Sequence, residues 1–301
     1  MAGWTLDSVP TPTRLAEGVA PELGRGGSAS PRDGLPVRLA TAGIGIPLTV
    51  IFIVLGIPWL AFGVAAVIML GIAEFYRMVE RIGYRPVWEA GMGAGVLFAL
   101  EAAWPRPWGS AILPALLVYT VVVYLRRGRL ERILANTALT LFGALYVGYL
   151  MSYVLRLRAL DAGPAHSAGP AAALLVVFSV WAADSAAYFV GLSAGRRKLL
   201  PQVSPNKSIE GAVGGVAAGV FAGLICGGAF HIALPMAAAV GGLCAVASIL
   251  GDLWESAIKR EVGVKDAGGI LPGHGGILDR FDGLLFAIVV GYFAMRWWPG
   301  S

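Results

Sequence analysis

The sequence predicts an all-α, polytopic integral membrane protein of about nine transmembrane helices, with a polar site facing the cytoplasm. Of its 301 residues, 57% are hydrophobic and only 14% are charged, whereas soluble domains carry about 25% charged residues. The mean hydropathy is +0.74. The apolar residues form successive stretches near the roughly 20 residues that cross a hydrocarbon core of about 30 Å. Because backbone groups in lipid have to hydrogen-bond internally, we expect these stretches to be helices.

The chain begins with a polar segment and continues as a series of apolar stretches. Residues 1–37 hold five prolines and six glycines and lack the apolar core of a signal peptide, so we interpret them as a flexible cytoplasmic tail. Residues 38–170 are expected to form N-terminal transmembrane helices, and residues 171–301 a C-terminal transmembrane region that contains the two long polar loops. The nine expected spans are residues 39–55, 58–76, 88–104, 111–125, 133–155, 171–191, 212–230, 233–250 and 284–298.

The basic residues predict how these spans are oriented. With the N-terminus in the cytoplasm and nine alternating spans, 19 of the 23 lysines and arginines lie on the cytoplasmic side, as the positive-inside rule requires. Both long polar loops, residues 192–211 and 251–283, then lie on that side. We therefore expect a multi-pass protein of the inner cell membrane. Basic residues dispersed among many loops argue against nucleic acid as a partner.

Two features of the spans favour structural interpretations. Residues 211–227 carry glycine at every fourth position, which gives one smooth helix face. Such a face favours close helix packing within the protein, with a homodimer interface as the lesser alternative. Glu74 and Glu101 lie near the ends of their spans, so we expect snorkelling or interfacial hydration of their carboxylates.

Charge is most concentrated between Asp252 and Asp282, where ten lysine, arginine, aspartate or glutamate residues occur, six of them acidic. If the eighth span continues as a helix beyond the membrane, Asp252, Glu255 and Lys259 share one face of it. Carboxylates beside basic side chains suit Mg²⁺, which retains waters and substrate phosphates. The glycines of this loop would let the backbone approach an anion closely. The alternative is a solvated loop that contains ion pairs.

One acid lies deep in an expected span. Asp184 is about seven residues from the inner end of its span, roughly 10 Å deep, where a charge is costly unless it is paired, hydrated or bound to metal. A metal ligand and a structural hydrogen bond to a neighbouring helix are equally good interpretations. The loop that follows offers Lys207 and Ser208 as phosphate donors, close to the start of the next helix.

Several familiar motifs are missing from the sequence. It contains no GxxxxGK[ST], CxxC, HExxH or GxSxG pattern. This argues against a P-loop NTPase, against the common zinc sites and against a serine hydrolase with a nucleophile elbow.

Residues 256–282 follow the pattern S-x-I-K-R-x4-K-D-x-G-x2-L-P-x-H-G-G-I-x-D-R-F-D. This long pattern resembles the signature of the phosphatidate cytidylyltransferase (CDP-diacylglycerol synthase) family. Asp184-Ser185 and residues 204–211 are also similar to family motifs. They depart from them at Ser185, where threonine is common, and at Asn206 and Ile209, where lysine and tryptophan are usual.

The resemblance implies that phosphatidate and CTP react at the lipid bilayer to give CDP-diacylglycerol and pyrophosphate, with Mg²⁺ as cofactor and the active site in the cytoplasm. The expected metal ligands are Asp184, Asp252, Asp279 and Asp282. The expected catalytic residues are Asp252, Lys259, Asp279, Arg280 and Asp282. The expected substrate-binding residues are Ser204, Lys207, Ser208, Glu210, Ser256, Arg260, Lys265, Asp266, His274, Gly275 and Gly276.

Two other functions remain as alternatives. A CTP-dependent polyprenol or phytol kinase would share the membrane and the nucleotide but would release CDP. A transporter for an anionic solute would carry charges or broken helices near the bilayer midplane in several spans, whereas Asp184 is the one deep charge here.

Overall fold

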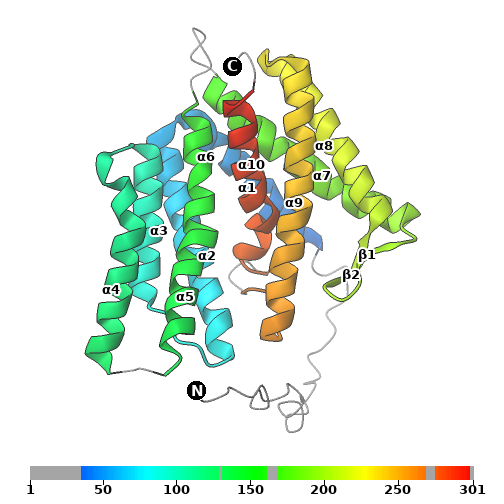
Figure 1. Ribbon diagram of the computed structural model, residues 1–301. Coiled ribbons are helices and arrows are strands. Elements are labelled where there is room, and N and C mark those ends of the chain that lie inside the picture. Colours follow the sequence, from blue (N-terminus) through cyan, green and yellow to red (C-terminus); the bar gives the residue numbers. More distant parts are fainter. Residues whose placement is uncertain (1–34, 129–130, 161–167, 269–274, 299–301) are drawn as a thin grey trace, which may run out of the picture.

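The computed structural model describes residues 35–128, 131–160, 168–268 and 275–298. Most of these residues lie in helices (Figure 1). The helices are α1 (Leu35–Leu55), α2 (Ile57–Arg81), α3 (Trp88–Ala103), the 3-10 helix η2 (Pro107–Ala111), α4 (Ile112–Arg127), α5 (Ile133–Gly143), the π-helical η3 (Ala144–Tyr149), α6 (Leu150–Arg158), α7 (Ala168–Ala194), α8 (Ile209–Phe230), α9 (Leu234–Val262) and α10 (Leu278–Arg296). An antiparallel hairpin of β1 (Lys198–Leu200) and β2 (Ser204–Ser208) precedes α8. The predicted helical fold is confirmed, and the hairpin was not predicted.

Each of the nine expected spans coincides with a helix. Six described segments are long and apolar enough to cross a membrane: Ile57–Arg81, Pro107–Arg127, Ile133–Arg158, Gly169–Ala194, Ile209–Phe230 and Leu234–Val262. The other three expected spans fall in α1, α3 and α10. Of these, α3 has only 16 residues, and α10 begins with charged residues. The protein is therefore helical and multi-pass, whereas the count of nine crossings stays a prediction.

Large apolar side chains cover much of the outer surface of the helices. Phe62, Val118, Phe189 and Phe221 are each more exposed than buried. Such side chains are costly in water, and a hydrocarbon environment removes that cost. The outer surface thus agrees with the membrane location that the composition indicates.

The glycine ladder of α8 packs against its neighbours within the chain. A Cβ atom on Gly215 would lie 2.9 Å from the carbonyl oxygen of Ala183 in α7, and one on Gly219 would lie 2.8 Å from that of Gly241 in α9. Glycine therefore allows the three backbones to approach closely. The prediction of packing within the protein is confirmed.

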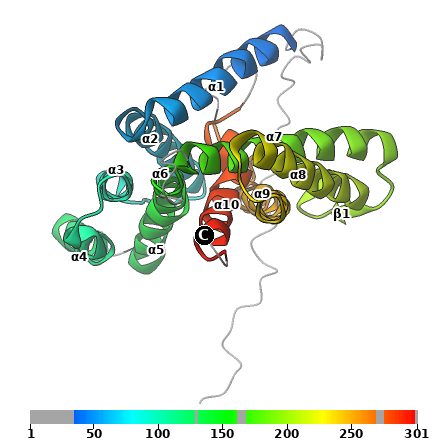
Figure 2. The same cartoon turned by 90° about the horizontal axis from the view of Figure 1, so that it is seen from above.

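Helix α10 lies inside the bundle and joins its two halves. Its Leu285 and Ile288 side chains are fully buried, and the helix contacts α2, α6, α7 and α9. Figure 2 shows α10 between α6 and α9, with α1 set apart on the far side of α2 and α7. The expected N-terminal and C-terminal groups of helices consequently share one core.

Several chain segments end together at one end of this bundle. The C-terminal ends of α2 and α9, the N-terminal end of α10 and the hairpin all lie at the lower end in Figure 1. Helix α9 continues to Val262 and is terminated by Gly263, whose φ of 75° suits a glycine helix cap. The expected extension of the eighth span as a helix is therefore confirmed.

The structure corrects the expectation for Glu74. Glu74 is 1% exposed, and its carboxylate accepts hydrogen bonds from the backbone of residues 277 and 278. Glu101 forms an ion pair with Arg156 of α6. Helix packing thus supplies Glu74 with donors inside the protein, so it does not reach the membrane interface, whereas interfacial hydration of Glu101 stays a prediction.

Candidate active site

The C-terminal part of α9 carries the polar face that the sequence predicts. Ser256 donates a hydrogen bond to Asp252 Oδ1 at 3.4 Å, and Lys259 Nζ lies 3.3 Å from Glu255 Oε2. These residues are neighbours because positions three and four apart lie one above the other on a helix. The face turns toward α10 and the hairpin, which supply the remaining charged side chains.

The hairpin and α7 meet this face near Asp252. Lys207 of β2 forms an ion pair with Asp252, and Ser248 of α9 donates to Asp184 Oδ1 at 3.1 Å. The structural hydrogen bond predicted as one interpretation of Asp184 is therefore present. Its role as a metal ligand, the other interpretation, stays a prediction.

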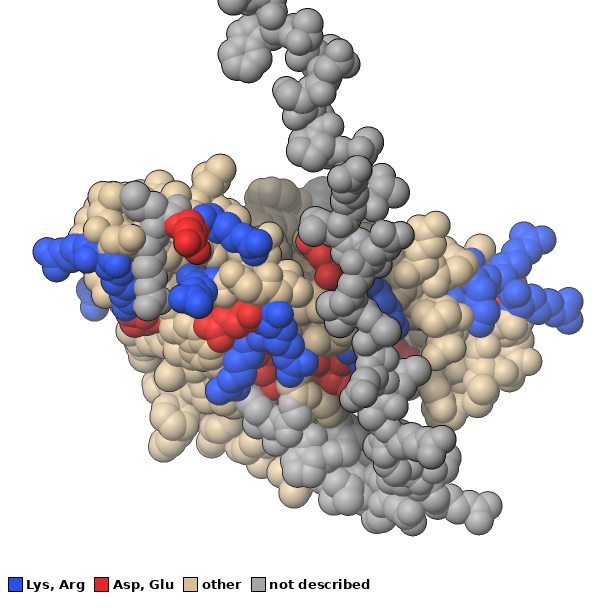
Figure 3. All heavy atoms as spheres, turned by 90° about the horizontal axis from the view of Figure 1, so that it is seen from below, with Lys and Arg blue, Asp and Glu red and all other residues tan. Residues whose placement is uncertain are grey.

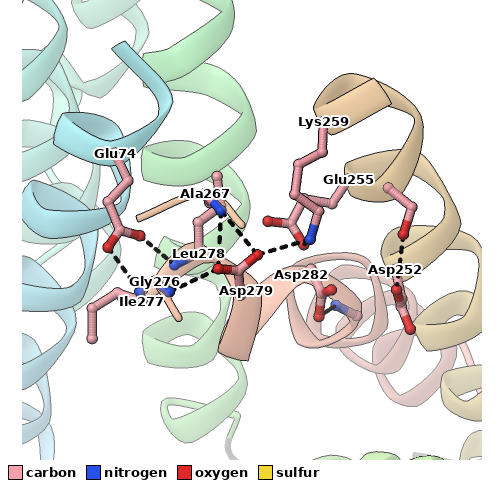
Figure 4. Close-up of polar contacts among 12 residues, drawn as sticks. Glu74, Asp252, Glu255, Lys259, Ala267, Gly276, Ile277, Leu278, Asp279 and Asp282 are labelled. Atoms are coloured by element: carbon pink, nitrogen blue, oxygen red, sulfur yellow. Dashed lines mark hydrogen bonds and ion pairs between the residues drawn. The ribbon is translucent and has the colours of Figure 1, made fainter. Parts of the chain in front are cut away.

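Asp279, in the first turn of α10, is surrounded by hydrogen-bond donors (Figure 4). Its side chain is 7% exposed, and Lys259 Nζ lies 2.8 Å from its Oδ1 atom. The backbone amides of Ala267 and Gly276 donate to its Oδ2 atom at 3.0 and 2.7 Å. Asp279 therefore connects Lys259 to Ala267 and Gly276, which lie toward the two ends of the loop between α9 and α10 (residues 263–277, the signature loop). Its role as a metal ligand stays a prediction.

Two carboxyl groups, that of the buried Glu255 and that of the partly buried Asp282, lie side by side near the centre of the site. Glu255 is fully buried, and Asp282 lies beside it ahead of the apolar stretch of α10. Glu255 Oε1 has no hydrogen-bond partner among the described residues, and neither has the buried hydroxyl of Tyr146 in η3. Burial, together with the adjacent Glu255, raises the pKa of Asp282 well above its usual range. Glu255 and Asp282 repel each other when both are ionised, so a shared proton or a bound cation would stabilise the pair.

Other predicted substrate-binding residues have structural partners. Ser208 Oγ accepts from the amide of Gly211 and caps α8. The Glu210 carboxylate accepts from the amides of Arg196 and Arg197, and Arg260 Nε donates to the carbonyl oxygen of Val203. These contacts fix the hairpin against α8 and α9.

The remaining predicted residues lie around the same end of the bundle. Ser204 pairs with Leu200 in the hairpin. Lys265, Asp266 and Arg280 are exposed, and Gly275 has a φ of 76°. Gly276 binds Asp279 as described. His274 lies outside the described residues.

Sequence reasoning missed three features of this site, namely the contact of Glu74 with α10, the partnerless Oε1 atom of Glu255, and Tyr146. Glu74 and Tyr146 lie in the N-terminal half, far from the signature loop in sequence. The available signal was the rarity of charge in apolar spans, since an acid there usually has a specific partner.

The carboxylates of this site suit an Mg²⁺ ion that is held by few protein ligands. Among the described residues, no group of three His, Cys, Asp or Glu side chains is arranged to hold a metal ion. Mg²⁺ usually needs only one or two protein carboxylates, because waters and substrate phosphates complete its octahedron. The partnerless Glu255 oxygen beside Asp282, and the Asp184 carboxylate near Asp252, are oxygen donors of this kind.

Comparison with known proteins identifies the family. Residues 36–298 match the model of the cytidylyltransferase family. The chain belongs to the cytidylyltransferase family. A phosphatidate cytidylyltransferase from Synechocystis sp. is 34% identical over 288 residues, which cover 87% of this chain and 97% of that protein.

Two further relatives match about half of this cytidylyltransferase. The phosphatidate cytidylyltransferase of Bacillus subtilis is 40% identical over 50% of the chain and 55% of that protein. That of Thermotoga maritima is 40% identical over 50% of the chain and 56% of that protein. The chain is accordingly a nucleotidyltransferase, as its signature loop indicates.

Proposed function

We propose that this cytidylyltransferase transfers CMP from CTP to phosphatidate, giving CDP-diacylglycerol and pyrophosphate for phospholipid synthesis. One observation carries the proposal: acidic side chains of α7, α9 and α10 and the amines of Lys207 and Lys259 meet where the membrane helices end. A polar site at the end of an apolar bundle suits a reaction between a water-soluble nucleotide and a lipid headgroup. The family membership and the relatives named above support the same reaction.

The reaction needs positioning and charge neutralisation more than a strong base. A phosphate oxygen of phosphatidate, already ionised near neutral pH, attacks the α-phosphorus of CTP. A new P–O bond forms as the bond between the α-phosphorus and the bridging oxygen breaks, and pyrophosphate leaves. No proton has to be removed from the nucleophile, so this chemistry needs no serine or cysteine nucleophile and no strong general base.

The basic residues of the site hold phosphates in this proposal. Lys207 and Lys259 are already paired with carboxylates, and a phosphate can take up the same ammonium donors. Arg280 and Lys265 are exposed at the same end and would bind the outer phosphates of CTP. Mg²⁺, held by Asp282 and Asp252 with Asp184 nearby, would supply positive charge to the triphosphate and the departing pyrophosphate.

The orientation proposed is cytoplasmic for both the N-terminus and the active site, in the inner membrane, with nine crossings. Figure 3 shows lysine and arginine side chains gathered on the face at which α2 and α9 end. Excess basic charge is typical of cytoplasmic membrane surfaces. CTP is a cytosolic nucleotide, so this orientation also gives the enzyme access to its substrate.

The lipid tails have to enter from the side of the bundle, because moving acyl chains through water costs about 0.8 kcal/mol per CH₂ group. A groove of about 350 Å³ lies between α2, α5 and α9 and is lined by apolar residues that include Phe75, Phe142 and Trp254. Trp254 directly precedes Glu255 on α9. The groove thus runs along the same segment of α9 that carries the polar face, and we propose it as a path for an acyl chain.

The test is incubation of the purified protein in detergent with phosphatidate, Mg²⁺ and each radiolabelled nucleotide in turn. Of the nucleotides, we expect only CTP to give a lipid-linked nucleotide together with pyrophosphate. We expect Asp252→Asn to lower the rate of this reaction at least about 100-fold. Glu80→Gln, an exposed acid of α2, serves as the control. Release of CDP with phosphorylation of an alcohol would instead favour the kinase, and no product from CTP would refute the proposal.

A further inference from the structure

Glu74 connects the N-terminal half of the protein to the active-site loop. Its Oε1 atom accepts from the amide of Ile277 at 3.0 Å, and its Oε2 atom accepts from the amide of Leu278 at 2.8 Å. These residues are 203 and 204 positions away in the sequence. Figure 4 shows the carboxylate directed at the start of α10 from α2. The first amides of a helix have no partner within it, and a carboxylate there also interacts favourably with the helix dipole.

Two glycines of the signature loop leave room for this carboxylate. A Cβ atom on Gly276 would lie 2.5 Å from Glu74 Oε2, and one on Gly268 would collide with Glu74 Oε1. Neither glycine has a positive φ among the described backbone angles. The absence of a side chain at these two positions is therefore explained by the close approach of Glu74 and not by backbone conformation.

The residues that Glu74 holds are directly connected to the charged residues of the site. Leu278 precedes Asp279, which binds Lys259 at 2.8 Å, and Asp282 follows about one helical turn later on α10. A shift of the α10 N-terminus would move both carboxylates relative to α9. A displacement of about 1 Å in a catalytic site is enough to cost about 100-fold in rate.

We propose that Glu74 is a positioning residue of the active site, which fixes the start of α10 and through it Asp279 and Asp282. The effect on rate rests on the function proposed above, whereas the effect on loop order does not. Glu74 touches neither reacting phosphate in this scheme. It acts through the backbone amides of α10 and through the space left by Gly268 and Gly276.

The first test measures hydrogen–deuterium exchange of the full chain in detergent for Glu74→Gln and for Glu80→Gln, an exposed acid on the same helix. The neutral amide presents one acceptor to two N–H donors, so the peptide covering residues 275–283 should exchange faster in Glu74→Gln only. Peptides of α7 and α8 should stay unchanged. Unchanged exchange at residues 275–283, or faster exchange throughout the protein, would overturn the proposal. This readout requires no enzymatic activity and therefore separates failure here from failure of the proposed function.

The second test uses steady-state kinetics of CDP-diacylglycerol formation. We expect Glu74→Gln to lower kcat about 10- to 100-fold, with a much smaller change in KM for CTP. Glu80→Gln should match the parent. A rise in KM with kcat unchanged would overturn the positioning role, because it would indicate a loss of nucleotide binding.

A double-variant cycle tests the contact itself. Gly276→Ala should lower kcat because its methyl group displaces the Glu74 carboxylate. Glu74→Ala removes that obstacle, so the double variant should be no slower than Glu74→Ala alone. Losses that multiply in the double variant would show that Gly276 is needed for another reason and would overturn this part of the proposal.

Discussion

At the scale of single residues, the site combines satisfied and unsatisfied acids in a small space. Asp279 receives donors on both oxygens, whereas Glu255 Oε1 has none among the described residues. An acid with every oxygen satisfied stabilises the local structure. An unsatisfied acid beside a second carboxyl group costs folding free energy and is retained where binding a cation repays it. Under the proposed function, we expect the two kinds of acid to differ in role, with Asp279 mainly organising the loop and the pair Glu255 and Asp282 taking part in ligand binding.

This difference leads to opposite expectations for stability and activity at Asp282. Asp282→Asn keeps an acceptor for the amide of Gly283, which donates to Asp282 Oδ1 at 2.6 Å, and removes one of two adjacent acids. We expect the rate of CDP-diacylglycerol formation to fall about 100-fold, while the melting temperature in detergent without substrate stays equal or rises. Initial rates and a thermal unfolding scan measure the two effects. A melting temperature several degrees lower would contradict the assignment of Asp282 to ligand binding.

At the scale of elements, the close packing of α8 against α7 and α9 depends on individual glycines of the ladder. We expect Gly219→Ala to lower the melting temperature in detergent, because its Cβ atom would lie 2.8 Å from the carbonyl oxygen of Gly241. Overpacking of this kind lowers the free energy of unfolding by about 1–3 kcal/mol. Gly228→Ala on the same helix is the matched control, since no atom lies within 4 Å of its added Cβ. Alanine there should be neutral or slightly stabilising. Equal melting temperatures for the two variants would show that the ladder does not determine packing.

The sequence predicts the helices and the polar face of α9, but not the hairpin or the contacts between distant elements. The expected spans lie in helices because a continuous apolar stretch of about 20 residues identifies a membrane helix without any knowledge of distant partners. The polar face of α9 followed from the spacing of Asp252, Glu255 and Lys259 alone. In contrast, the hairpin spans only residues 198–208, too short for a periodic signal. The occupied oxygens of Asp279 and the partners of Glu74 depend on which helices pack together, and sequence spacing contains no information about a contact across 203 residues.

At the scale of the whole molecule, CTP reaches the site only if the end of the bundle that carries the site faces the cytoplasm. The hairpin and the C-terminal end of α9 lie at one end of the bundle, and η2 between α3 and α4 lies at the other (Figure 1). Both native cysteines are buried, so a cysteine introduced at an exposed position is the reactive thiol that a membrane-impermeant maleimide reports. Gln202 in the hairpin turn, Glu261 on α9 and Ser110 in η2 are exposed and suit this purpose.

In sealed inside-out vesicles, we expect the maleimide to label Gln202→Cys and Glu261→Cys but not Ser110→Cys. In right-side-out vesicles or intact spheroplasts the pattern should reverse, because the positive-inside rule assigns the lysine- and arginine-rich end to the cytoplasm. The parent chain, which retains its two buried cysteines, gives the background. Labelling of Gln202→Cys and Glu261→Cys from opposite sides would separate the hairpin from α9. That result would break the site, because Lys207 and Asp252 could then not form their ion pair.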